Sequence, residues 1–151
     1  MEAISLYWKS FQKKHPEYQD HDIPMHYYYC DNKKDADECA ELVVKGIKQA
    51  TSSSLWWYKK HNELLPKIGD LAIVTNWEGT PKAITRVTKV SKVKLGEIDA
   101  AYAIKEGEGD KSLAYWNKVH WQYYTREMEP FGEKPTKDLI IVCEEFETIF
   151  V

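Results

Sequence analysis

A lysine and a hydroxyl three residues apart are the side chains of this chain best suited to chemistry. Lys48 and Thr51 follow an apolar stretch with helical spacing, residues 36–45. Gly46 is suited to end that helix, because a left-handed glycine carries no side-chain penalty. More hydroxyls and a cluster of aromatic residues come next, within residues 52–58. A cation, hydroxyls and aromatic faces together suit a planar, polar and often anionic ligand such as a nucleotide.

The Lys48 ammonium allows two kinds of chemistry, and Gly46, Ser53 and Trp56 are its neighbours expected to contact a ligand. Lysine can hold an anion, or it can accept a proton where burial lowers its pKa. Because most lysines lie on the surface, the plainer interpretation is a solvated Lys48 beside a threonine in the core. On a segment leaving a helix, we expect Lys48 to contribute little to the core.

An acidic loop broken by glycines supplies the second group of candidates, Glu106, Glu108 and Asp110. Glycine lets the backbone bend tightly, so these carboxylates can turn inward. A hard-metal loop would need further ligands at a recognisable spacing, and none follows here, so we expect no metal and no cofactor. Asp110 also precedes a helix expected over residues 111–126, where it can act as the N-cap.

Trp116 and His120 lie four residues apart and therefore share one face of that helix. The histidine can serve as an acid, a base or a hydrogen-bond donor at the rim of a cleft. It can equally be a half-buried histidine packed under aromatic rings. We predict that both side chains contact the ligand.

These motifs, in this order, resemble those of the ASCH domain, a relative of the PUA RNA-binding fold. The similarity rests on a GxKxxT motif at residues 46–51, an LPxxGD segment at residues 65–70, and a stretch from Glu106 to His120. It spans about residues 27 to 151. The resemblance implies a PUA-like small β-barrel with helices packed around it, in the α+β class, and a cleft near the GxKxxT segment.

The resemblance also implies a ligand and an activity. In small amidohydrolase members of the family, a glutamate joins the lysine and threonine of the motif, and Glu106 is our first choice for it, with Glu108 the second. Lys48 would be the base or activator, Thr51 the nucleophile or a water-positioning hydroxyl, and Glu106 the proton shuttle. The expected function is hydrolysis of RNA or of acetylated cytidine, and the alternative is a reader that binds RNA or a nucleotide without turnover.

Composition limits the partners. The 151 residues correspond to one domain, with residues 1–26 as an N-terminal helical extension. A net charge of −3 provides no global positive field for nucleic acid. Only Arg86 and Arg126 offer a bidentate fork, so we expect no binding to double-stranded DNA. The expected partner is RNA or a nucleoside or nucleotide, and the oligomeric state is left open.

The spacing of the cysteines indicates whether they form disulfides, and the length of the apolar stretches indicates whether the chain crosses a membrane. Three cysteines without a short CxxC pair argue against a disulfide scaffold or a zinc knuckle. Cys39 in a helical stretch and Cys143 in an apolar strand are expected as buried thiols. No signal region and no apolar stretch of about 18 residues is present, so we expect no membrane contact and a cytoplasmic location.

The elements that must position these residues follow from periodicity. Helices are expected over residues 3–14, 36–45, 98–104 and 111–126, with one or two turns in 56–64. Asp35 and Glu38 form a possible capping box for the second helix. Strands are expected over residues 25–30, 71–76, 82–90 and 138–151. Because residues 82–90 alternate apolar and polar, one face of that strand should cover a core and the other should face water. The last three strands should share one curved sheet.

Overall fold

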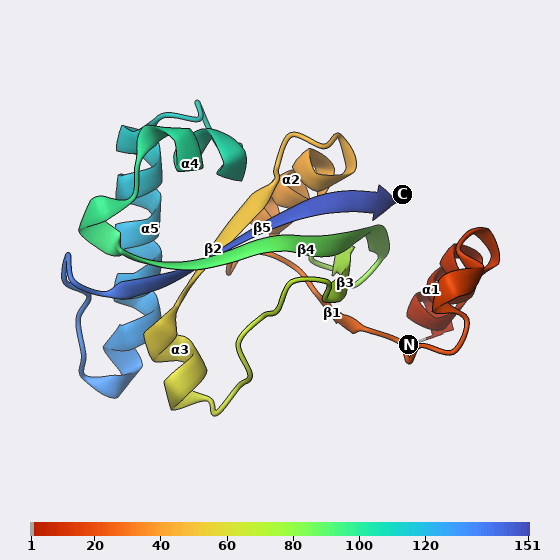
Figure 1. Ribbon diagram of the computed structural model, residues 1–151. Coiled ribbons are helices and arrows are strands. Elements are labelled where there is room, and N and C mark those ends of the chain that lie inside the picture. The colour runs from red at the N-terminus through yellow and green to blue at the C-terminus, as the bar shows by residue number, and fades with distance from the viewer. Residues whose placement is uncertain (1) are drawn as a thin grey trace.

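The computed structural model describes residues 2–151, and its centre is one curled sheet of five strands. The strands are β1 (Met25–Tyr27), β2 (Ala50–Ser54), β3 (Leu71–Thr75), β4 (Pro81–Lys94) and β5 (Ile140–Phe150). Their order across the sheet is β1-β3-β4-β5-β2, and only the β1–β3 pair is parallel. The long strands β4 and β5 run side by side across the molecule (Figure 1). The sheet is a half-barrel whose two edges are β1 and β2.

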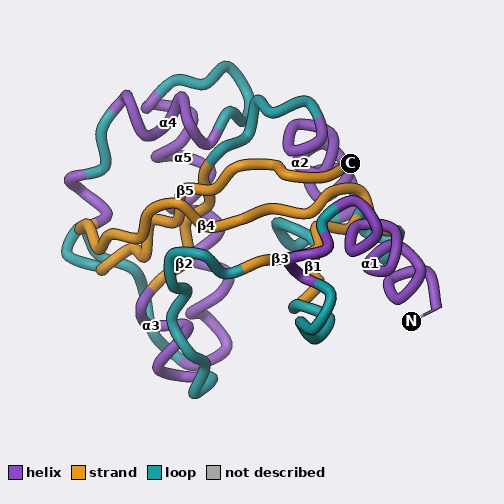
Figure 2. Tube along the Cα trace, turned by 45° about the vertical axis from the view of Figure 1, so that its right-hand side comes forward, coloured by secondary structure: helices purple, strands orange, loops and turns teal. Residues whose placement is uncertain are grey.

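Helices cover different parts of this sheet. They are α1 (Glu2–Lys14), α2 (Lys33–Val44), α3 (Leu55–Lys60), α4 (Ala100–Glu106) and α5 (Leu113–Met128). Short 3-10 turns span Pro16–Tyr18, Leu95–Glu97 and Glu129–Phe131. Two views agree that α4 and α5 lie at one end of β4 and β5 and α1 at the other (Figures 1 and 2). None of the helices in residues 2–151 is long and apolar enough to cross a membrane.

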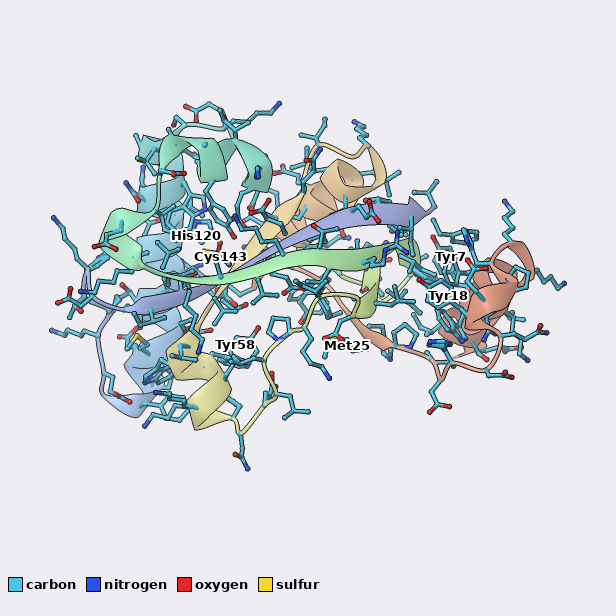
Figure 3. All side chains as sticks on the ribbon, viewed as in Figure 1. Tyr7, Tyr18, Met25, Tyr58, His120 and Cys143 are labelled. Carbon is cyan, nitrogen blue, oxygen red and sulfur yellow. The ribbon has the colours of Figure 1, made fainter. Side chains whose placement is uncertain are left out.

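Three apolar clusters form the core between the sheet and these helices. Helix α1 packs Trp8 and Phe11 on Ile73 and Ile84. Helix α2 packs against Val74, Ala83 and Phe146, and helices α4 and α5 pack against Ile141 and Cys143. Figure 3 shows the side chains of these clusters, with Tyr7 and Tyr18 near α1 and His120 and Cys143 at the far end of the sheet.

The expected α+β class and the single curved sheet containing the three later strands are confirmed. The expectation that β4 has one wet face is wrong for its first half, where Ala83, Ile84 and Thr85 are buried in succession. Ile84 belongs to the α1 cluster and Ala83 to the α2 cluster, so the two faces are both covered there. Thr88 and Lys89 are exposed.

Several element boundaries differ from the expectations. Strand β2 was not expected, because its serines are not among the residues enriched in strands, but it forms by pairing with β5. Asn32, not Asp35, caps α2 by accepting a hydrogen bond from the Asp35 amide. Ser112, not Asp110, caps α5 by accepting from the Tyr115 amide. The first strand is shorter than expected, and the last strand begins only at Ile140.

Candidate functional site

Lys48 points into the protein from the loop between α2 and β2, and it is only 1% exposed. Gly46, at φ +72°, turns the chain after the helix, and the amides of Ile47 and Lys48 both donate to the Leu42 carbonyl. These bonds fold the loop back on the helix and aim the lysine inward. The plainer alternative of a solvated Lys48 is therefore excluded, and the expectation that Lys48 contributes little to the core is wrong.

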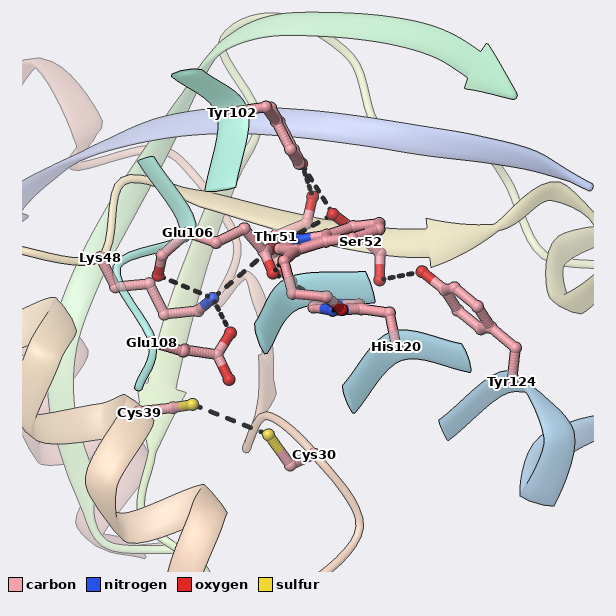
Figure 4. Close-up of polar contacts among 11 residues, drawn as sticks. Cys30, Cys39, Lys48, Thr51, Ser52, Tyr102, Glu106, Glu108, His120 and Tyr124 are labelled. Carbon is pink, nitrogen blue, oxygen red and sulfur yellow. Dashed lines mark hydrogen bonds and ion pairs between the residues drawn. The ribbon is translucent and has the colours of Figure 1, made fainter. Parts of the chain in front are cut away.

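Two carboxylates surround the buried ammonium (Figure 4). Lys48 Nζ lies 2.8 Å from Glu108 Oε2 and 3.5 Å from Glu106 Oε1. The Tyr29 ring centroid is 5.1 Å away. Burial alone would lower the pKa of Lys48, but the charges of Glu106 and Glu108 outweigh it and raise the pKa above its usual value. Lys48 is therefore held as a cation, which does not suit a general base.

Glu106, at the end of α4, is the centre of the hydrogen-bond network. It is 1% exposed, and its Oε1 accepts from Ser52 Oγ at 3.2 Å. Its Oε2 accepts from Trp116 Nε1 at 3.2 Å and lies 2.9 Å from His120 Nε2. Burial raises the pKa of Glu106, but Lys48 and His120 lower it more strongly, to about 2. The buried carboxylate is thus ionised and fully engaged.

His120 connects this carboxylate to helix α5. Its Nδ1 lies 2.9 Å from the Trp116 carbonyl oxygen, one turn earlier in the helix, and its ring stacks on Trp116 at 3.9 Å between centroids. Both ring nitrogens therefore face oxygen atoms that only accept hydrogen bonds. The ring is thus held between helix α5 and the Glu106 carboxylate.

Strand β2 is tied to the helices by two tyrosine hydroxyls. Tyr102 Oη donates to the Thr51 carbonyl at 2.8 Å and lies 2.8 Å from Ser52 Oγ. Tyr124 Oη donates to the Ser52 carbonyl at 3.2 Å. Burial raises the pKa of Tyr102, so its hydroxyl stays protonated. The strand edge is therefore held in place while the Thr51 side chain has no hydrogen-bond partner within residues 2–151.

A cavity of about 670 Å³ opens beside these groups, between the edge strands β1 and β2. Lys48, Thr51, Glu106, Glu108 and His120 all line it. Its walls are rich in aromatic rings, which are Tyr27, Tyr28, Tyr29, Trp57, Tyr58 and Tyr123. It also carries six carboxylates, at Glu63, Asp70, Glu106, Glu108, Glu127 and Glu144, against two lysines, Lys48 and Lys67.

The structure brings together most, but not all, of the residues expected at the site. Ser53 lines the cavity, and Trp116 lies behind Glu106. Trp56 does not line it, because its ring packs on Phe131 and its Nε1 donates to Glu133. Trp57 lines it instead. Gly46 shapes the loop without lining the cavity, and Asp110 is exposed and accepts from the Ser112 amide.

Sequence reasoning missed Ser52, Tyr102 and Cys30. Ser52 donates to Glu106 and, like Thr51 and Ser53, lines the cavity, and no motif distinguished it from the neighbouring serines. Tyr102 had no motif to distinguish it. Cys30 lies 3.6 Å from Cys39, sulfur to sulfur, although their spacing matches no known pattern. Cys39 and Cys143 are buried thiols, as expected.

Comparison with known proteins gives a consistent match. The ASCH domain family model matches residues 25–150. An ASCH domain structure from Lactobacillus crispatus JV V101 is 33% identical with a TM-score of 0.94, over 100% of this chain and 96% of that chain. A protein structure from Enterococcus faecalis V583 is 31% identical with a TM-score of 0.90, over 99% and 89%. No curated protein matches the chain.

Proposed function

The chain belongs to the ASCH domain family, whose members are generally thought to bind RNA. We propose that this chain hydrolyses the acetyl amide of an acetylated cytidine. The observation that carries the proposal is the ammonium of Lys48, held between Glu106 and Glu108 at the wall of the cavity. Amide hydrolysis needs a proton acceptor for the attacking water and a positive charge for the oxyanion. The cluster offers a group for each task.

Different degrees of burial separate the roles of the two carboxylates. Both oxygens of Glu106 are occupied by Lys48, Ser52, Trp116 and His120, so this carboxylate positions the cation. The Glu108 side chain is 17% exposed and lines the cavity, so it can reach a water molecule. Glu108 is therefore our choice for the general base, in place of Lys48.

The proposed reaction has two steps. Water, positioned by the Thr51 hydroxyl, attacks the acetyl carbonyl carbon and gives its proton to Glu108, while Lys48 stabilises the oxyanion. The tetrahedral intermediate then expels the exocyclic amine of cytidine, which takes the proton from Glu108. Cytidine and acetic acid are the products, the acid ionises to acetate by releasing its proton to solvent, and the Glu108 carboxylate returns to its starting state.

The walls of the cavity support a nucleoside as the ligand. Tyr58 and Trp57 offer rings on which a base can stack, and such stacking is typical of proteins that bind single bases. The excess of carboxylates opposes a phosphate chain but suits the N–H donors of a base edge. A neutral nucleoside, or one base of a single strand, fits this cavity better than a duplex.

The test is turnover of acetylcytidine by the wild-type protein and by Glu108→Gln. We expect the variant to lose at least about 100-fold in turnover while it still binds cytidine, since a general base typically contributes that much. Glu145→Gln is the matched control, because the Glu145 side chain is 18% exposed and pairs with Lys105 outside the cavity. Equal turnover by the two variants would exclude Glu108 as the base.

The alternative is a reader that uses the same cavity without turnover. The aromatic lining favours it as much as it favours hydrolysis. Wild-type protein that binds acetylcytidine or a short single-stranded RNA but releases no acetate and no RNA fragments would establish the reader and end the hydrolase proposal.

A further inference from the structure

Two cysteine thiols lie together beside Glu108 (Figure 4). The Cys30 and Cys39 sulfur atoms are 3.6 Å apart. Cys30 is partly exposed and lines the cavity, whereas Cys39, in α2, is 2% exposed. Within residues 2–151 neither sulfur has another hydrogen-bond partner. Both are thus free to serve as ligands.

Glu108 adds an oxygen to this pair. The two sulfur atoms and a Glu108 carboxylate oxygen all lie within 4.8 Å of one another. The three residues come from three parts of the chain, namely the loop after β1, helix α2 and the loop after α4. Lys48 fixes the Glu108 carboxylate through Oε2 at 2.8 Å, so the group is oriented before any ligand arrives.

The sulfur separation fits a shared metal ion. Two thiolates about 2.3 Å from a tetrahedral zinc ion lie about 3.8 Å apart, whereas disulfide sulfurs lie about 2.05 Å apart. The observed 3.6 Å is close to the first value. Cys30 also has a φ of +68°, a left-handed conformation that residues with side chains rarely adopt. Such positions are commonly kept where a side chain has a functional task.

A neighbouring triplet is less suitable. Glu106, Glu108 and His120 also bring ligand atoms within 4.8 Å of one another. However, His120 Nε2 is already hydrogen-bonded to Glu106, and Glu106 accepts from Ser52 and Trp116 as well. A metal there would have to break this buried network. The cysteine pair requires no such exchange.

We propose that Cys30, Cys39 and Glu108 bind one thiophilic divalent cation, with Zn²⁺ the best match, and that its fourth position faces the cavity. Binding releases the two thiol protons to solvent. The two thiolates, Glu106 and Glu108 then carry four negative charges in total. The ion carries two positive charges and Lys48 carries one. Thiolate and carboxylate ligands with one open position are typical of zinc. This site does not require the proposed hydrolysis, but it competes with it for Glu108, because a carboxylate bound to the ion cannot also act as the general base.

The test is titration with Co²⁺ and Zn²⁺ of the protein kept reduced by a phosphine. We expect one equivalent of Co²⁺ to give a thiolate-to-cobalt absorption band that Zn²⁺ abolishes. Cys30→Ser should bind zinc at least about tenfold more weakly. Mutation of a residue that only contacts a metal ligand already lowers metal affinity by about that factor. Cys143→Ser is the control, because this buried thiol lies in a different cluster. Zinc should raise the melting temperature of wild type but not of Cys30→Ser.

Three results would overturn the proposal. Wild-type protein that gives no thiolate-to-cobalt band does not use the cysteines. Unchanged zinc affinity in Cys30→Ser places the ion elsewhere. A protein isolated with its mass lowered by two hydrogens, and unable to bind cobalt after reduction, identifies the pair as a disulfide couple instead.

Discussion

Lys48 places a positive charge where water has almost no access, and Glu106 and Glu108 compensate for it. A buried ion pair is roughly neutral for stability against an apolar replacement of the whole group. Removing one partner is different, because it leaves an uncompensated charge in the interior. The residues proposed for catalysis are therefore also residues on which the fold depends.

Lys48→Met should destabilise the protein by about 3–5 kcal/mol, the usual cost of breaking a buried pair. The measurement is the free energy of unfolding in urea. Lys45→Met, at an exposed lysine three residues earlier, should change it by less than about 0.5 kcal/mol. Equal stability of the two variants would mean that Lys48 is solvated in solution.

Glu144, also in the cavity wall, predicts a dependence of stability on pH. Burial, with a smaller effect of Asp70, raises its pKa from 4.5 to about 7. An acid with a raised pKa binds its proton more tightly in the folded state, so its contribution to stability is complete below about pH 4.5 and is lost as the pH rises through 7. The loss is at most about 3 kcal/mol, and partial exposure should reduce it to about 1–2 kcal/mol.

The check is the difference in free energy of unfolding between pH 5 and pH 8. Wild type should lose more stability over this interval than Glu144→Gln, whose side chain has no proton to release. An identical pH dependence in the two proteins would show that Glu144 is not buried enough to matter.

Among the elements, two glycine turns set where the charged residues lie. Gly46 ends the segment after α2 at φ +72°, and Gly107 ends α4 at φ +75°. One turn precedes Lys48, and the other lies between Glu106 and Glu108. The turns differ in their surroundings. A Cβ at Gly107 would lie 2.8 Å from the Ile47 carbonyl oxygen, whereas a Cβ at Gly46 would meet nothing within 4 Å.

Gly107→Ala should therefore lower the free energy of unfolding more than Gly46→Ala does. In both variants the left-handed conformation of alanine destabilises the protein by about 1–2 kcal/mol. In Gly107→Ala, overpacking adds a further destabilisation of about 1–3 kcal/mol. Because the clash pushes apart the two loops of the site, turnover should fall in Gly107→Ala only. Urea unfolding and acetylcytidine turnover measure the two effects, and equal losses in both variants would contradict the role of the close approach.

The elements also show what the sequence could predict. Helices α1, α2 and α5 and strands β3 to β5 carry periodic apolar residues and were predicted within a few positions. Strand β2 could not be predicted, because Ala50–Ser54 has no strand pattern and becomes a strand only through its partner β5. The contact of Lys48 with Glu106 and Glu108 was expected from family resemblance, but the burial of the lysine depends on the loop folding back, which no local pattern predicts.

At the scale of the whole molecule, the charge of the cavity decides which ligands can enter. Six carboxylates and two lysines line it. The chain as a whole has a net charge of −3, so its surface adds no opposing field. Under the proposed function, the base should therefore bind in the cavity and the phosphate should be unfavourable.

A cytidine nucleoside should bind more tightly than its 5′-monophosphate, by roughly tenfold at low salt, because each unscreened charge pair is worth about 1 kcal/mol. The difference should shrink in high salt, which screens exposed charges. Calorimetric titration at two salt concentrations measures it. Tighter binding of the monophosphate at low salt would show that Lys48 or Lys67 outweighs the carboxylates.

The pairing of β2 with β5 has a consequence for how the protein is made. Thr51 lies opposite Glu144, and within residues 2–151 β2 has no other strand neighbour. During synthesis, β2 must therefore wait until β5 has left the ribosome, and closing so long a loop is slow. The ribosome-bound chain can fold α2 early, but under the proposed function it cannot hold a nucleoside until β5 has emerged and paired with β2. Binding of the ligand therefore requires that all five strands of the sheet are in place.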